Sequence, residues 1–278
     1  MERRVLTDVI IIGYSEFLIT EEKSKATCEK YIRDVRRFKV YTGGEPVTKE
    51  MVVAWKNSLV NNYAVRSVNS MLAAVNSLFD FLGWSDCKVK NLKLQKQMYC
   101  AEEKELKKTE YLRLLEASKK NIQLNLVLQT ICGTGIRVSE LKYFTAEAVA
   151  AGEVNINCKS KVRRILIPGK LRKLLLDYAR KRKITEGAIF VGKNGAPLDR
   201  SCIWRQMKRL CEAANVKESK VFPHNLRKLF ARSFYIVEKD IAQLADVLGH
   251  SNINTTRIYI MTTGEEHLKK IERLGLVV

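Results

Sequence analysis

The sequence predicts a mainly α-helical chain with one small β-sheet, arranged as an N-terminal four-helix bundle and a C-terminal mixed α/β domain. Three observations support this fold class. Apolar residues recur at helical spacing through most of the chain, one pair of strand-like runs lies between residues 153 and 167, and 278 residues suffice for two modest domains. We expect domains at 1–84 and 106–278, joined by a basic linker over 85–105.

The N-terminal part reads as four short helices. The first is expected over residues 7–21, and Ser24 and Thr48 are suitable caps for the second and third. Gly43 and Gly44 separate these two helices. The fourth is expected over 64–82, where six apolar residues fall at helical spacing: Val68, Met71, Leu72, Val75, Leu78 and Phe79. Gly83-Trp84 then ends the bundle.

The segment 85–105 has no steady periodicity, and four lysines are spread along it: Lys88, Lys90, Lys93 and Lys96. Such a segment is either a solvated connector or a basic strap that crosses a nucleic-acid backbone. Both interpretations stay open at this point.

The second domain opens with two expected helices, at 106–119 and 122–133. A β-hairpin follows, with strands over 153–158 and 163–167 and a tight turn at Lys159-Ser160-Lys161. Helices are expected again at 170–183, 200–214, 224–236, 240–248 and 252–260. Near the C-terminus, Leu268, Ile271 and Leu274 form one apolar side at helical spacing.

The charge balance indicates a polyanionic partner. The formal net charge is +20, of which +5 falls in residues 1–100 and +15 in the remainder. Seven scattered cysteines include no C-x-x-C pair, so neither a disulfide framework nor a zinc site is predicted, and free thiols fit the cytoplasm. The longest apolar run near the N-terminus, Val9 to Ile12, is far too short to span a membrane.

Three short motifs carry the chemistry. They are Gly133-Thr134-Gly135-Ile136-Arg137-Val138-Ser139-Glu140-Leu141, Pro223-His224-Asn225-Leu226-Arg227, and Leu248-Gly249-His250 followed nine residues later by Tyr259. Arginine's planar fork matches phosphate oxygens, and histidine moves protons near neutral pH. Tyrosine can form a covalent intermediate. Together they suit the binding of a phosphodiester that a phenol oxygen attacks.

These motifs, in this order and spacing, closely resemble the tyrosine recombinase (phage integrase) family. The resemblance is strong over residues 101–278 and general in the N-terminal part. It implies a core-binding domain, a catalytic domain and DNA strand exchange without metal, ATP or another cofactor. The two-domain length favours Xer-type enzymes or the integrases of small mobile elements.

The resemblance also implies residue roles. Arg137, Arg227, His224 and His250 hold the scissile phosphate, and Tyr259 attacks it to form a 3′-phosphotyrosine. The family carries the lysine that protonates the leaving 5′-oxygen in the hairpin turn between the two arginine motifs. We expect Lys159 in that role, with Lys161 as the alternative, because Ser160 between them leaves the register open. Glu140 is a weaker candidate for orienting Arg137.

The implied partners are double-stranded DNA with a specific recombination site, further copies of the chain in a tetramer on DNA, and for some reactions an accessory directionality protein. No membrane is implied. Two alternatives remain, a type IB topoisomerase-like nicking-closing enzyme and a DNA-binding accessory protein without catalysis. A covalent-complex assay separates the accessory protein from a recombinase, and plasmid relaxation by a monomer without a recognition site would favour the topoisomerase-like enzyme.

Overall fold

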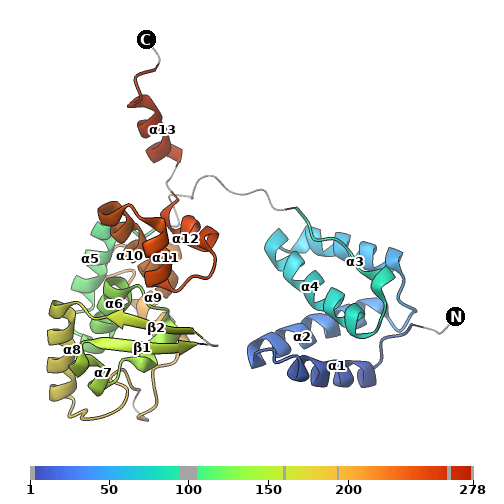
Figure 1. Ribbon diagram of the computed structural model, residues 1–278, viewed down its shortest axis with the longest axis horizontal. Helices are drawn as coiled ribbons and strands as arrows, with labels where there is room; N and C mark the ends of the chain where they lie inside the picture. The colour runs from blue at the N-terminus through green and yellow to red at the C-terminus, as the bar shows by residue number, and fades with distance from the viewer. Residues whose placement is uncertain (1–3, 94–104, 159–160, 193, 262–263, 277–278) are drawn as a thin grey trace. The chain divides into compact units, whose positions relative to one another are not determined.

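The computed structural model describes residues 4–93, 105–158, 161–192, 194–261 and 264–276, and gives only the backbone of residues 157, 158, 161, 162, 266 and 270. The chain forms two compact units, Met1–Lys96 and Gln97–Val278 (Figure 1). Among the described residues, no helix is both long and apolar enough to cross a membrane.

The first unit is a bundle of four helices. They are α1 (Asp8–Thr20), α2 (Lys25–Thr42), α3 (Lys49–Asn62) and α4 (Val65–Phe81). Thr7, Ser24 and Thr48 each accept a hydrogen bond from the third backbone N–H of the helix that follows. Each such cap contributes about 1 kcal/mol, and the two predicted caps lie where the sequence places them.

Helix α4 supplies the centre of the bundle. All six of its predicted apolar residues are buried, and Phe79 lies edge-on to Phe38, which in turn packs against Trp55 with ring centroids 4.8 Å apart. The buried face of α4 predicted from the helical spacing of its apolar residues is therefore confirmed.

Residues 85–92 of the predicted linker belong to the first unit. A short 3-10 helix, η1 (Ser85–Cys87), leads into an extended segment in which Cys87 and Val89 are buried in the bundle core. The Asn76 side chain bonds both backbone groups of Val89, at 2.8 and 3.0 Å, and Asn69 does the same for Leu92. Residues 94–104 lie outside the described part, so the limits 1–84, 85–105 and 106–278 stay a prediction.

The second unit contains one β-hairpin among helices. Its elements are α5 (Lys108–Ala117), α6 (Ile122–Thr134), η3 (Val138–Tyr143), α7 (Ala146–Ala151), β1 (Glu153–Cys158), β2 (Lys161–Leu166), α8 (Gly169–Lys181), α9 (Arg200–Arg209), η4 (Glu218–Lys220), α10 (Pro223–Glu238), α11 (Ile241–Leu248), α12 (Ile253–Ile260) and α13 (Gly264–Glu272). The strands are antiparallel, with Cys158 opposite Lys161, so Lys161 belongs to β2 and not to the predicted turn; Lys159 and Ser160 lie outside the described residues.

Helix α6 lies at the centre of this unit and contacts α5, α8, α9 and α10. Its apolar residues belong to the main core cluster, while α10, α11 and α12 share a smaller cluster built on Ala231, Leu244, Leu248 and Tyr259 (Figure 1). The motif-bearing helices are therefore packed directly on one another.

Two predictions for the second unit need correction. The helix expected over 200–214 ends at Arg209, because the chain turns back so that Cys211, Ala214 and Val216 enter the core. The segments η3 and α7 were not predicted, because six residues are too few to show a helical period.

Candidate active site

The first turns of α10 place His224 and Arg227 on one face. Pro223 occupies the first helical position, where its missing N–H costs nothing. Arg227 is 1% exposed. Its guanidinium donates to the carbonyl oxygens of Gly135 and Leu248 and to Nε2 of His250, at 2.7 Å and 2.9 Å for the last two. It thereby joins all three motifs.

Arg227 is a buried cation whose partners are all neutral. Burial, followed by the positive charge of Arg137, lowers the pKa of Arg227 to about 10. Its Nε has no hydrogen-bond partner among the described residues. A buried, incompletely satisfied guanidinium favours an entering anion.

Gly135 makes this arrangement possible. It ends α6 with a φ of +66°, and a Cβ there would lie 2.3 Å from the Phe230 ring. Only glycine combines this left-handed conformation with the close approach of α10. Gly135 therefore serves the packing that brings Arg227 to its carbonyl.

Arg137 immediately precedes the 3-10 helix η3, as its N-cap residue, and is held by Glu140. The Glu140 carboxylate accepts from the Arg137 backbone N–H at 2.7 Å and from its Nη1 at 3.0 Å. The Arg137 side chain remains 46% exposed, whereas Glu140 is 3% exposed. The predicted Arg137–Glu140 contact is present in the structure, and the outer edge of the guanidinium faces solvent.

Tyr259 lies between the two motif histidines. Its hydroxyl is 3.4 Å from Nδ1 of His224, and its ring meets the rings of His224 and His250 edge-on, with centroids 4.9 and 5.1 Å apart. The side chain is 7% exposed. The predicted nucleophile is thus fixed in orientation, beside a group able to take its proton.

The second nitrogen of His250 is held by Thr256, a buried residue that the sequence analysis did not single out. Nδ1 of His250 lies 2.9 Å from Oγ1 of Thr256. Because arginine only donates, Nε2 accepts from Arg227 and Nδ1 carries the proton toward Thr256. Burial, followed by the charges of Arg227 and Arg137, lowers the pKa of His250 to about 4.

This shift predicts a pH dependence of stability. Between about pH 6.5 and pH 4 the unfolded chain binds a proton at His250 that the folded chain does not, so the free energy of unfolding falls as the pH falls. We expect a loss of about 1–2 kcal/mol, since the ring is partly exposed and solvent screens the repulsion. Thermal melts of wild type and His250→Gln across this window measure it. The variant should lose less stability on acidification; parallel pH profiles would contradict the prediction.

Arg163 is a site residue that sequence reasoning missed. Its Nη2 donates to Glu140 at 2.7 Å, and its Nη1 donates to the backbone carbonyl of Leu248. The signal was present in the strand alternation: Arg163 shares its face with Ile165 and Ile167, which are both buried. An arginine on the buried side of a strand points to a specific partner.

The structure thus brings together Arg137, His224, Arg227, His250 and Tyr259. Lys159 lies outside the described residues, and only the backbone of Lys161 is described, so the choice between them stays a prediction. Within the described ranges, no group of three His, Cys, Asp or Glu side chains is placed to hold a metal ion.

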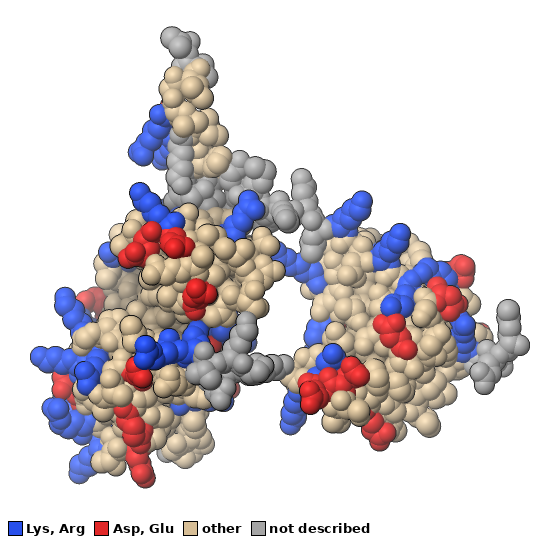
Figure 2. Space-filling view, viewed as in Figure 1, with Lys and Arg blue, Asp and Glu red and all other residues tan. Residues whose placement is uncertain are grey.

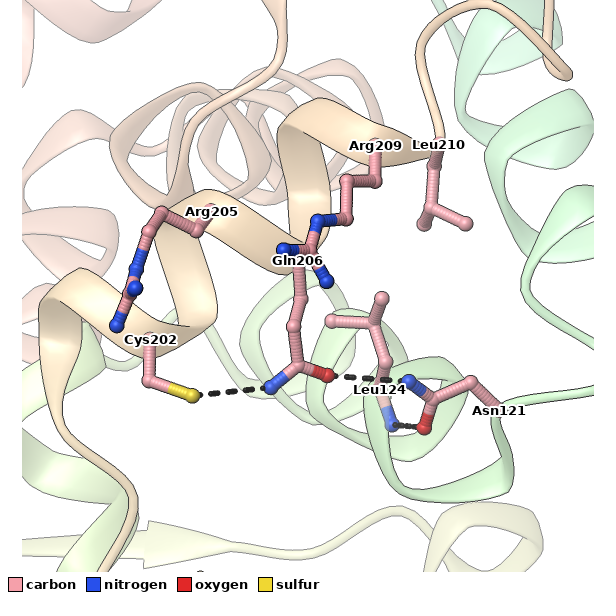
Figure 3. A pocket seen from close by; sticks show the side chains of 7 residues that line it. All are labelled: Asn121, Leu124, Cys202, Arg205, Gln206, Arg209 and Leu210. Atoms are coloured by element: carbon pink, nitrogen blue, oxygen red, sulfur yellow. Dashed lines mark hydrogen bonds between the residues drawn. The ribbon is translucent and has the colours of Figure 1, made fainter.

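A separate hollow of about 370 Å³ lies between the start of α6 and α9, next to Cys202, Arg205 and Arg209 (Figure 3). Its polar contacts join Gln206 to Asn121 and to the sulfur of Cys202. None of the motif residues lines it. The chemistry-bearing residues therefore gather elsewhere, where α10, α11 and α12 meet.

Comparison with known proteins identifies the family of the chain. Residues 104–266 match the phage integrase family, and residues 11–86 match the phage integrase N-terminal SAM-like domain. The chain belongs to the phage integrase family. The resemblance noted from the motifs is confirmed, and with it the enzyme class, a tyrosine-type site-specific recombinase.

Relatives of this phage integrase family member align along its whole length. Tyrosine recombinase XerA of Pyrococcus furiosus is 28% identical over 100% of this chain and 98% of its own. Tyrosine recombinase XerA of Thermococcus kodakarensis is 29% identical over 97% of this chain and 96% of its own.

Solved structures share the fold. A lambda integrase dimer bound to a COC′ core site matches with a TM-score of 0.75 at 18% identity, covering 94% of this chain and 96% of that one. The crystal structure of XerA recombinase matches with a TM-score of 0.55 at 23% identity, covering 98% and 100%. The predicted fold class, a helical N-terminal domain followed by a mainly helical catalytic domain with a small sheet, is confirmed.

Proposed function

We propose that this protein recombines DNA at a specific site through a 3′-phosphotyrosine on Tyr259. The observation that carries the proposal is the convergence of Tyr259, His224, His250, Arg137 and Arg227 around one point. No carboxylate neutralises Arg227 among the described residues, so a phosphate is the charge partner that its position suits. Figure 2 shows Lys and Arg side chains on the visible face of both units, and the formal net charge of +20 favours binding to the DNA backbone.

The first step transfers the phosphoryl group to the protein. Tyr259 Oη attacks the phosphorus, the bond from phosphorus to the 5′-oxygen breaks, and the phenolic proton passes to His224. Burial and the charge of Arg227 lower the pKa of His224, which keeps its ring neutral and able to accept that proton. Arg137 and Arg227 offset the charge that develops on the phosphate oxygens.

His250 supports the same transition state. The negative phosphate offsets the repulsion from Arg227 and Arg137, so the pKa of His250 rises on binding and Nε2 can donate to a phosphate oxygen. The 5′-hydroxyl of a second strand then attacks the phosphotyrosine. One phosphodiester replaces another. The energy of the broken bond is kept in the phosphotyrosine, so the reaction needs no ATP.

A nicked suicide substrate tests the proposal. A protein–DNA adduct that survives denaturing electrophoresis is expected, and mass spectrometry of its peptides should place the nucleotide on Tyr259. Exchange of strands between two duplexes identifies a recombinase, whereas plasmid relaxation without exchange would identify the nicking-closing alternative. Binding without any adduct would leave the accessory-protein alternative.

Lys159 is proposed as the general acid. We expect Lys159→Ala to lose cleavage of ordinary DNA and to recover it on a 5′-bridging phosphorothiolate, because a thiolate leaves without a proton. Lys161→Ala, at the first residue of β2, is the matched control. If the phosphorothiolate rescued Lys161→Ala and not Lys159→Ala, Lys161 would be the general acid.

The C-terminal segment is proposed to dock on a neighbouring subunit in a DNA-bound tetramer. Helix α13 carries Leu268 and Ile271, which are 54% and 50% exposed, and Leu274 follows at 63%. Such a row of exposed apolar side chains suits burial against a partner.

Deleting residues 264–278 should leave binding to a single DNA site unchanged and abolish synapsis and recombination. Gel shift and strand-exchange assays measure the two effects. A full-length variant with Glu265→Ala and Lys269→Ala, which removes an exposed ion pair and keeps the apolar row, serves as control. Normal recombination by the truncated protein would refute the docking.

A further inference from the structure

Arg163 stands at a junction of three backbone segments that carry the site. From β2 it reaches Glu140 on η3 and the end of α11, where Nη1 contacts the carbonyls of Leu248 and Val247. Leu248 also accepts from Arg227. One side chain therefore links the hairpin to the parts of the fold that hold Arg137 and His250.

Arg163 is placed to position other groups and not to touch the phosphate. Its side chain is 12% exposed, and both terminal nitrogens are engaged by neighbours. Gly249 packs against its stem so closely that a Cβ there would lie 2.7 Å from Cδ of Arg163. The glycine of the Leu-Gly-His motif thus leaves room for this arginine as well as adopting a φ of +63°.

The two carboxylate oxygens of Glu140 are divided between two arginines. Oε2 accepts from Nη2 of Arg163 and from the backbone N–H of Arg137, and Oε1 accepts from Nη1 of Arg137. Glu140 therefore binds the Arg137 guanidinium through one nitrogen, Nη1. Its Nη2 lies 3.5 Å from the Gly249 carbonyl, at the limit of a hydrogen bond.

We infer that Arg163 is a positioning residue for strand cleavage: it occupies one oxygen of Glu140 and so keeps the second edge of the Arg137 guanidinium open to the phosphate. An arginine and a carboxylate left to themselves tend to pair through both nitrogens. Without Arg163, the Glu140 carboxylate can rotate and accept from both terminal nitrogens of Arg137. The guanidinium then faces Glu140 and no longer the phosphate. The inference rests on the proposed function.

The test is single-turnover cleavage with two substrates, one ordinary and one carrying a methylphosphonate at the scissile position. Arg163→Met should cleave ordinary DNA about 10- to 100-fold more slowly at unchanged DNA affinity, as expected for a displaced catalytic group. The methylphosphonate lacks one charged oxygen and needs Arg137 less. On it, Arg163→Met should cleave within about threefold of wild type, and Arg137→Ala should be rescued in the same way.

The neighbouring residue supplies a matched control. Arg164 lies on the same strand, is 67% exposed and pairs with Glu153, so Arg164→Met should behave as wild type on both substrates. Arg163→Lys serves as a second variant that preserves charge if the methionine variant is unstable. The inference would be overturned if Arg163→Met cleaved both substrates more slowly by the same factor. It would also be overturned if both Arg163 variants cleaved unmodified DNA at the wild-type rate. Failure of wild type and Arg164→Met to form an adduct would instead reject the proposed function.

Discussion

Replacing Tyr259 with phenylalanine should abolish the covalent adduct on a nicked suicide substrate while DNA affinity stays within about twofold of wild type. The substitution removes one oxygen and keeps the ring that packs against His224 and His250. Nothing else in the motif set can replace that oxygen, because phenol attack is the step that forms the intermediate. Adduct formation under denaturing electrophoresis and a gel shift measure the two quantities.

Tyr235 provides the control for Tyr259. It lies on α10 beside the same apolar cluster, yet it has no motif around it. Tyr235→Phe should form the adduct at the normal rate. An adduct that persists in Tyr259→Phe would remove Tyr259 from the nucleophile's role.

Substituting Arg227 with lysine should lower the cleavage rate at least about a hundredfold, comparable to losing one oxyanion-stabilising donor. The guanidinium reaches Gly135, Leu248 and His250 from one planar group. A single ammonium on a different stem cannot reproduce these three directions and also present a fork to the phosphate. Arg137→Lys should lose cleavage to a similar extent, with little change in DNA affinity for either variant.

The Arg227 substitution should also destabilise the fold, by about 1–3 kcal/mol, because buried acceptors lose their donor. Arg232→Lys is the matched control on the same helix, since its contact is an ion pair with Glu105 that lysine can preserve. Single-turnover cleavage and thermal melts of both variants separate the two effects. Near-normal cleavage by Arg227→Lys would refute its part in the transition state.

Local features were readable in the sequence because they depend on residues a few positions apart. The caps Ser24 and Thr48 bond backbone groups three residues on, and the apolar side of α4 follows from the 3.6-residue period. The three motifs were equally visible, and the resemblance that they carry proved correct. The roles of Arg137, His224, Arg227, His250 and Tyr259 remain proposals that the geometry supports.

The tertiary structure decided what depends on residues far apart in the chain. Arg163 meets Leu248 across 85 positions, and Arg227 meets Gly135 across 92. The ring of Phe230 leaves no room for a side chain at Gly135. The hydrogen bond of Asn76 to Val89 holds part of the predicted linker against the bundle.

The physical reason is that periodicity and capping report only which side of an element is buried or how it ends. Which charged group meets which carbonyl depends on how α10 packs against α6 and α11, and on the contact of Arg163 from β2 with the end of α11. The sequence by itself therefore determined the family, the longer helices with the β-hairpin, and the motif residues. Only the fold decided that Arg163 and Arg137 share Glu140, and that Thr256 holds the ring of His250.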